Sequence, residues 1–244
     1  MNLPKLLCYI FIVPLLNACA DNPDLLDAAV RIAQQSTRTS GPLSQGDIRA
    51  GLKEALRVSA DQVVSQLGVT NGFNADPQIH IPLPDSLRKI RNVAARLGMK
   101  RSFDDLETRL NRAAEAATPQ ARQLFQDAIL KMTLADARSI LSGPDDAATQ
   151  YFQRTMSQPL SEKMKPIVDQ AVSSVGVVQS YNNAVSRLGP LAPALPNYKQ
   201  LLIDHVVKRG MDGIFHYMAQ EEAAIRHDPA KRITELLRKV FGGA

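Results

Sequence analysis

Three amphipathic helices predicted in close succession, at residues 103–143, constrain the fold of this chain more than any other feature. Their apolar residues recur every three or four positions, the spacing that places side chains on one face of an α-helix. The inward residues of the first helix are Leu106, Leu110, Ala113 and Ala117. The residues expected on its opposite, solvent-facing side are Glu107, Asn111, Arg112 and Glu115. Because alanines permit close approach of helices, this stretch predicts a helical core.

The ends of these three helices are marked by residues typical of helix boundaries. Thr118-Pro119 stops the first helix and starts the second, because threonine can cap free N–H groups and proline suits the first helical position. Thr133 and Asp136 form the T-x-x-D pattern of a capping box, which starts the third helix. Gly143-Pro144 ends it.

The composition fits one all-α domain. The chain has 244 residues, of which 45% are apolar, so it can bury a sizeable core. Further helical patterns lie at residues 24–35, 46–67, 86–97, 145–155, 160–175, 177–188 and 198–226. We expect a bundle-like array of antiparallel or orthogonal helices over residues 47–244. A short helix and tether (19–46) and a signal peptide (1–18, alternatively 1–20) are expected to precede it.

Residues 1–20 have the pattern of a bacterial secretion signal. Lys5 precedes an apolar run at 6–16, which is shorter than the roughly 20 residues of a transmembrane helix and is typical of a signal peptide. Residues 16–19, Leu-Asn-Ala-Cys, resemble a lipobox and predict lipid attachment at Cys19, with the outer membrane favoured because Ala20 is not the aspartate of the inner-membrane retention signal. Alternatively, residues 18–20 are an ordinary A-x-A cleavage site, which predicts a soluble periplasmic protein. Either processing leaves no disulfide and no free thiol.

Residues 77–84, Pro-Gln-Ile-His-Ile-Pro-Leu-Pro, are the one strand-like stretch of the sequence. Proline has no backbone N–H and cannot donate to a sheet. With prolines at 77, 82 and 84, this stretch is predicted to be an extended strap over the helices, with His80 packed in it.

Five segments together resemble a known family. They are GLKEAL (51–56), IHIPLP (79–84), LNRAAEAATPQA (110–121), the DAI, MT, DA and IL groups within 127–141, and EEAAIRHDPAKRITELLRKVFG (221–242). In order and spacing they are similar to the proteobacterial domain-of-unknown-function family 4197, over nearly the whole mature chain. The resemblance implies an all-helical envelope protein with a signal peptide, and it assigns no activity and no catalytic residue.

A run of basic residues without an intervening acid occupies residues 86–102. Its members are Arg88, Lys89, Arg91, Arg96, Lys100 and Arg101. A basic amphipathic helix can dock on anionic lipid headgroups or on an acidic protein. The alternative is a solvated face of an ordinary core helix. The formal net charge of +5 is too small to indicate nucleic-acid binding.

The histidines do not predict a metal site. His205, His216 and His227 recur every 11 residues, which on a helix separates them by about 16 Å, too far to share one metal ion. Asp212 and His216 could supply two ligands, but no third ligand is near in sequence, and both are expected on a solvated face. No metal and no other cofactor is predicted.

Glu221 continues the apolar stripe of the long helix at 198–226. Burial disfavours an ionised carboxylate unless a cation pairs with it. A structural ion pair is the favoured interpretation, and the alternative is a catalytic acid of a hydrolase-type envelope enzyme. No nucleophile-elbow, metalloprotease, P-loop or dinucleotide motif accompanies it.

These features favour a non-enzymatic envelope protein, a helical scaffold that binds a protein partner or a lipidic ligand. Its predicted contact with the membrane is the lipid at Cys19. Nothing in the pattern indicates an oligomeric state.

Overall fold

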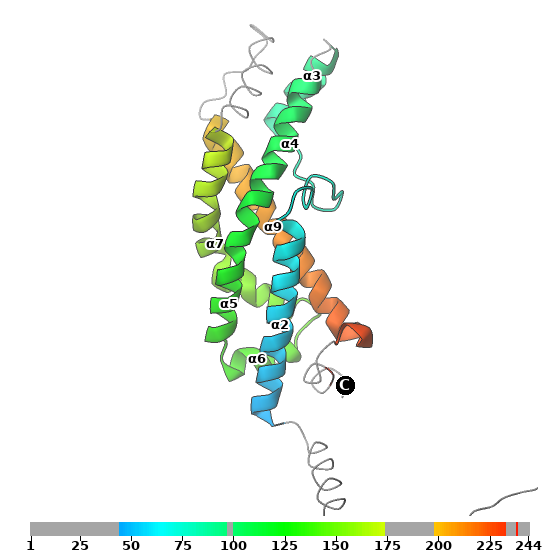
Figure 1. Cartoon of the computed structure of the whole chain (residues 1–244), viewed down its shortest axis with the longest axis vertical. Coiled ribbons are helices and arrows are strands. Elements are labelled where there is room, and N and C mark those ends of the chain that lie inside the picture. Colours follow the sequence, from blue (N-terminus) through cyan, green and yellow to red (C-terminus); the bar gives the residue numbers. More distant parts are fainter. Residues whose placement is uncertain (1–43, 97–99, 174–197, 233–237, 239–244) are drawn as a thin grey trace, which may run out of the picture. The chain divides into compact units, whose positions relative to one another are not determined.

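The structure is a computed structural model that describes residues 44–96, 100–173, 198–232 and 238 (Figure 1). Its elements are α2 (Gln45–Leu67), α3 (Asp85–Arg96), α4 (Lys100–Ala117), η2 (Thr118–Gln120), α5 (Ala121–Lys131), α6 (Leu134–Leu141), α7 (Ala147–Ser173), α9 (Tyr198–His227) and η4 (Pro229–Lys231). Over these ranges the chain forms helices, turns and loops without a strand, which confirms the all-α prediction. No helix in them has both the length and the apolar character needed to cross a bilayer. The signal peptide, Cys19, residues 19–43 of the predicted short helix and tether, and the helix predicted at 177–188 lie outside the described residues.

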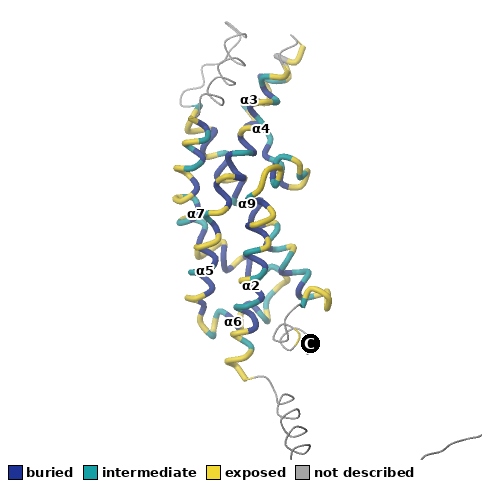
Figure 2. Tube along the Cα trace, in the orientation of Figure 1, coloured by how far each residue is buried: buried dark blue, intermediate teal, exposed yellow. Residues whose placement is uncertain are grey.

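The core is built around α7 and α9, which pack against each other along much of their lengths. α4 packs on both of them, and α2 packs on α5 and α9. Four buried phenylalanines, Phe73, Phe103, Phe125 and Phe152, come from separate segments and meet in one apolar cluster. Each helix turns one face to this core and another to solvent, so buried and exposed residues alternate along it (Figure 2).

The three-helix stretch forms as predicted, with differences at its joints. The Thr133–Asp136 capping box is present, because Thr133 Oγ1 accepts from the Asp136 N–H and the Asp136 carboxylate accepts from the Thr133 N–H. Thr118 does not cap a helix; its hydroxyl donates to the Ala114 carbonyl, and Pro119 lies in the short 3₁₀ turn η2. α4, η2 and α5 therefore follow one another without a loop.

The predicted solvent-facing side of α4 is wrong at two positions. Asn111 has no exposed surface and Glu115 is 4% exposed. Both face residues 69–84, the connection from α2 to α3, which contains the predicted strap at 77–84 and which we call the strap from here on. A helix can be covered on two sides at once, so polar spacing alone did not identify the solvent side of α4.

The two helices predicted at 145–155 and 160–175 are one helix, α7, with Pro159 and Pro166 inside it. Each interior proline removes one backbone hydrogen bond and costs about 3 kcal/mol. Four fully buried residues recur every four positions across both prolines: Met156, Leu160, Met164 and Val168. Burial of each contributes about 1.5–3 kcal/mol, so continuous packing outweighs the two prolines.

Candidate functional site

The strap is held by a row of polar side chains on α4. Glu107, Asn111 and Glu115 are four residues apart and therefore lie along one face of that helix. The Glu115 Oε1 accepts from the N–H groups of Phe73 (3.1 Å) and Asn74 (3.0 Å). The Glu107 Oε2 accepts from the Leu83 N–H at 3.0 Å. Carboxylates thus take the place of a neighbouring strand for the backbone of the strap.

Asn111 binds both backbone groups of one strap residue. Its Oδ1 accepts from the Ile81 N–H at 2.8 Å, and its Nδ2 donates to the Ile81 carbonyl at 2.9 Å. Buried backbone groups must find partners, and the prolines of the strap prevent a regular ladder. This pairing explains how an extended, proline-rich segment lies over helices, as the sequence predicted.

α9 contacts the strap with four polar side chains, one of which, Gln220, donates to Gln78 Oε1 at 2.9 Å. His205 Nε2 lies 2.7 Å from the Pro82 carbonyl oxygen, and His216 Nε2 lies 3.0 Å from Gln78 Oε1. The Tyr217 hydroxyl donates to the Asp76 carboxylate. Close approach depends on Gly213, since a Cβ there would lie 2.7 Å from Phe73 Cε1.

Two titratable groups at this contact are perturbed. Burial lowers the pKa of His205, and the nearby Arg209 and Lys208 act in the same direction. A neutral His205 imidazole can donate its Nε2–H to Pro82. The hydrogen bond to Asp76, followed by burial, raises the pKa of Tyr217 to about 12. Both groups therefore stay uncharged at pH 7 and hold the strap in place.

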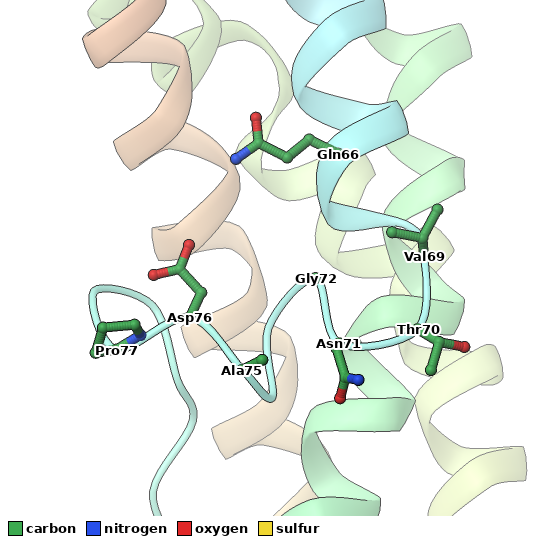
Figure 3. Close-up of a pocket in the computed structure, with 8 residues that line it drawn as sticks. All are labelled: Gln66, Val69, Thr70, Asn71, Gly72, Ala75, Asp76 and Pro77. Atoms are coloured by element: carbon green, nitrogen blue, oxygen red, sulfur yellow. The ribbon is translucent and has the colours of Figure 1, made fainter.

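An open hollow of about 380 Å³ lies where α2 passes into the strap (Figure 3). Its lining comes from Gln66 and from strap residues between Val69 and Pro77. Asp76 is the one acid among the lining residues, and Tyr217 already occupies it. The hollow therefore offers no pair of groups suited to acid–base chemistry.

Two neighbouring hollows lie between the strap and α9, and Arg209 lines both. The smaller has a volume of about 190 Å³, with Gln78, His80, Asp212 and His216 among its lining residues. The larger, about 420 Å³, we call the α3 hollow because it lies where α3 begins. It is lined by Pro84, Asp85 and Ser86 on one side and by Leu201, His205, Lys208 and Arg209 of α9 on the other.

The buried acid of α9 is Glu222, one position after the predicted Glu221. Glu222 is 6% exposed, and its carboxylate accepts from the N–H groups of Ala148 (2.8 Å) and Thr149 (2.9 Å) in the first turn of α7. Arg226 Nη2 lies 2.9 Å from Glu222 Oε1 and also donates to the Ile140 carbonyl. Glu222 thus caps α7, and Arg226 links that cap to the end of α6.

Glu221 itself is only partly buried and is paired. Its side chain is 15% exposed, with Lys231 Nζ at 3.6 Å, and its Oε1 accepts from Gln62 Nε2 at 3.0 Å. Glu221 therefore forms a structural ion pair between α9 and η4, and a hydrogen bond from α2 supports it.

The six basic residues at 88–101 fall into two groups. Three have acidic neighbours: Arg88 lies 2.6 Å from Asp85, Arg91 lies 3.3 Å from Glu107, and Lys100 lies 3.9 Å from Asp104. The other three, Lys89, Arg96 and Arg101, are exposed and have no acidic partner in the part of the chain that the structure describes. We call Lys89, Arg96 and Arg101 the docking set.

The histidines are spread over separate contacts. His80 lies 3.1 Å from Glu107, and His227 lies 2.8 Å from Asp145 at the far end of α9. Within the described ranges, no three histidine, cysteine or acidic side chains gather closely enough to hold a metal ion.

Sequence reasoning missed Glu222 and the strap-binding row of Glu107, Asn111 and Glu115. The row had a usable signal, since three polar residues four apart on a helix can face a single extended segment. Glu222 had none, because nothing near it in sequence indicates that it meets α7.

No curated protein and no solved structure matches this chain. The family model described as Protein of unknown function (DUF4197) matches residues 42–242, which include every described element. The chain belongs to the DUF4197 family.

Proposed function

We propose that this protein is a non-enzymatic scaffold of the bacterial cell envelope that docks on an anionic membrane surface through α3 and the start of α4. Its place is the periplasmic side of the envelope, where it is attached by a lipid at Cys19 or released by cleavage after Ala20. The docking set, Lys89, Arg96 and Arg101, makes the contact.

The observation that carries the proposal is that three exposed cations without an acidic partner among the described residues follow one another on α3 and the first turn of α4. Lys89 and Arg96 are seven residues apart, so they lie on one face of α3, about 10 Å apart along its axis. Arg101 follows in the first turn of α4. An unpaired Lys or Arg near an anionic lipid surface contributes about 1 kcal/mol of binding energy, and exposed side chains can reach the headgroups.

The use of the buried acids supports a scaffold rather than an enzyme. Glu115 and Glu222 accept backbone N–H groups, and Glu221 is paired with Lys231. A catalytic acid needs a free oxygen that faces substrate. The hydrolase alternative that the position of Glu221 suggested gains no support from these contacts.

The docking set is tested in cells that incorporate a photoactivatable fatty acid into their phospholipids. A Cys19→Ser background removes the predicted lipid anchor, so that any remaining lipid contact comes from the folded domain. In this background we compare the parent protein with Lys89→Gln/Arg96→Gln/Arg101→Gln, the docking variant. Lys131→Gln/Arg138→Gln/Lys163→Gln, the control variant, removes the same charge from exposed positions on other elements.

We expect the parent and the control variant to crosslink phospholipid equally and the docking variant to lose most of that yield. Equal yields from all three proteins would rule the proposal out.

Lipid attachment is tested separately by fractionation. If Cys19 is lipidated, Cys19→Ser moves the protein from the membrane fraction to the periplasm, and mass spectrometry of the parent finds a lipidated N-terminal cysteine. A parent protein that begins at Asp21 would show ordinary cleavage.

A further inference from the structure

The α3 hollow combines features that fit one class of ligand. Its volume of about 420 Å³ lies within the range of small-molecule sites, about 300–1,000 Å³. Pro84 and the 40% exposed Leu201 give it an apolar edge, while Lys208 and Arg209 give it cations. An apolar edge beside cations suits an amphiphilic anion.

The charges at the hollow leave one cation uncompensated. Asp85 lies 2.6 Å from Arg88, Lys208 lies 3.1 Å from Asp212, and both pairs are exposed. Arg209 has no acidic partner among the residues that the structure describes. The Lys208–Asp212 pair is exposed and therefore weak, so Lys208 can turn to a bound anion at little cost.

The start of α3 places neutral donors beside the same hollow, which Ser86 lines and Leu87 does not. The Arg88 N–H donates to the Pro84 carbonyl, which makes Pro84 the residue before the helix, and proline has no side-chain oxygen to cap it. In the described structure the N–H groups of Ser86 and Leu87 have no acceptor. Ser86 lines the hollow, and its hydroxyl oxygen is inaccessible to solvent and has no hydrogen-bond partner. Rotation about its Cα–Cβ bond can redirect that hydroxyl.

We propose that the α3 hollow binds a phosphate group, held by Arg209 and Lys208 from α9 and by the first turn of α3. The guanidinium of Arg209 binds two phosphate oxygens, and the free N–H groups of α3 bind a third. The apolar part of the ligand lies against Leu201 and Pro84. This inference builds on the proposed docking at an anionic surface, since it gives that surface a specific headgroup site.

A phosphate group can come from a lipid headgroup or from a soluble metabolite, and the test separates them. Glycerol phosphate is titrated into the protein purified after expression of the full chain, and the amide resonances of Ser86 and Leu87 are followed by NMR. Vesicles of zwitterionic phospholipid with an added phosphatidic acid are tested in parallel by co-sedimentation. The variants are Arg209→Gln at the site, Lys163→Gln as an exposed control on α7, and the docking variant.

We expect glycerol phosphate to shift the Ser86 and Leu87 amides and to bind Arg209→Gln roughly 10-fold or more weakly, the loss typical of one charged hydrogen-bonding partner. Lys163→Gln should bind like the parent. A matching loss of vesicle binding in Arg209→Gln identifies a lipid headgroup, whereas unchanged vesicle binding identifies a soluble phosphate. The melting temperature of Arg209→Gln, an exposed substitution, verifies that the variant is folded.

The inference is wrong if glycerol phosphate leaves the α3 amides unshifted, or if Arg209→Gln binds it as well as the parent does. These outcomes do not contradict the proposed docking function, because the docking variant tests that surface independently. Conversely, if the docking variant binds both vesicles and glycerol phosphate as well as the parent does, the proposed docking function is wrong and the phosphate site is retained.

Discussion

Glu221 and Glu222 are adjacent residues of α9 with very different surroundings. Glu222 accepts two N–H groups of α7 and is paired with Arg226, whose side chain is 11% exposed. Glu221 is paired with Lys231, whose side chain is 44% exposed, and accepts no backbone N–H group of α7. Removing one partner of a buried pair leaves an uncompensated charge, whereas removing a surface partner costs little.

We predict that Glu222→Ala lowers the free energy of unfolding by about 3–5 kcal/mol. Glu221→Ala is the matched control and should cost at most about 1 kcal/mol. Urea denaturation followed by circular dichroism measures both. Equal losses would mean that Glu222 does not act as the cap of α7.

His205 makes the stability of the fold depend on pH. Burial lowers its pKa in the folded protein, so between that lowered value and the ordinary value of about 6.5 the unfolded chain binds more protons than the folded one. The contribution of a neutral His205 to the free energy of unfolding is therefore present above about pH 6.5 and is lost as the pH falls below that value.

His205→Gln should remove this part of the pH dependence, because a glutamine amide can donate to the Pro82 carbonyl without titrating. We expect the parent to lose more unfolding free energy than His205→Gln between pH 7.5 and pH 5.5 in urea titrations. Parallel losses in both proteins would contradict the assignment, since every other titrating group is common to the two.

At the scale of elements, the strap depends on α4 and α9 together. Asn111→Ala leaves the buried backbone groups of Ile81 without partners, which costs about 1–3 kcal/mol per group. We predict faster amide hydrogen exchange at Ile81 and Leu83 in this variant, with unchanged exchange in the middle of α7. Gln123→Ala, an exposed change on α5, is the control and should leave exchange in the strap as it is. Unchanged exchange at Ile81 in Asn111→Ala would contradict the role given to the α4 row.

Two buried glycines of α9 give a second test of the same contact. Alanine is better than glycine within a helix by about 1 kcal/mol. At Gly210 the added Cβ meets the flexible end of Met164 at 3.0 Å, so Gly210→Ala should be nearly neutral or stabilising. At Gly213 it would lie 2.7 Å from the Phe73 ring and 3.3 Å from Ile79 Cβ, so Gly213→Ala should displace the strap and destabilise the protein. Thermal unfolding ranks the two, and a Gly213→Ala protein as stable as Gly210→Ala would show that the strap is not packed as described.

Apolar spacing predicted most helices and their inward faces, because helix burial in this chain follows a 3.6-residue period. The positions of three prolines predicted the strap, because proline cannot donate a hydrogen bond to a sheet. Apolar spacing could not predict the second covered side of α4, since Asn111 and Glu115 are polar and only the tertiary fold brings the strap to them. Glu221 follows Ile203 by 18 residues, which is five whole turns at about 100° per residue, so helical period alone places Glu221 below the buried Ile203 and gives no sign of Glu222.

Across the whole molecule, the polar groups that build the fold are different from the cations that remain available. Glu107, Glu115 and Glu222 are occupied by backbone N–H groups, while the docking set has no acid to neutralise it among the described residues. Three such cations together are worth about 3 kcal/mol at an anionic lipid surface, or about 100-fold in affinity. Exposed charges are screened within about 8 Å at physiological salt, so this binding must weaken as salt is added.

Vesicle co-sedimentation of the Cys19→Ser protein tests docking on an anionic surface. We predict binding to anionic vesicles at low salt, release as salt increases, and no binding to zwitterionic vesicles. The docking variant should bind about 100-fold more weakly than the control variant, which carries the same net charge. Equal affinity of the docking and control variants for anionic vesicles, or binding that does not change with salt, would contradict it.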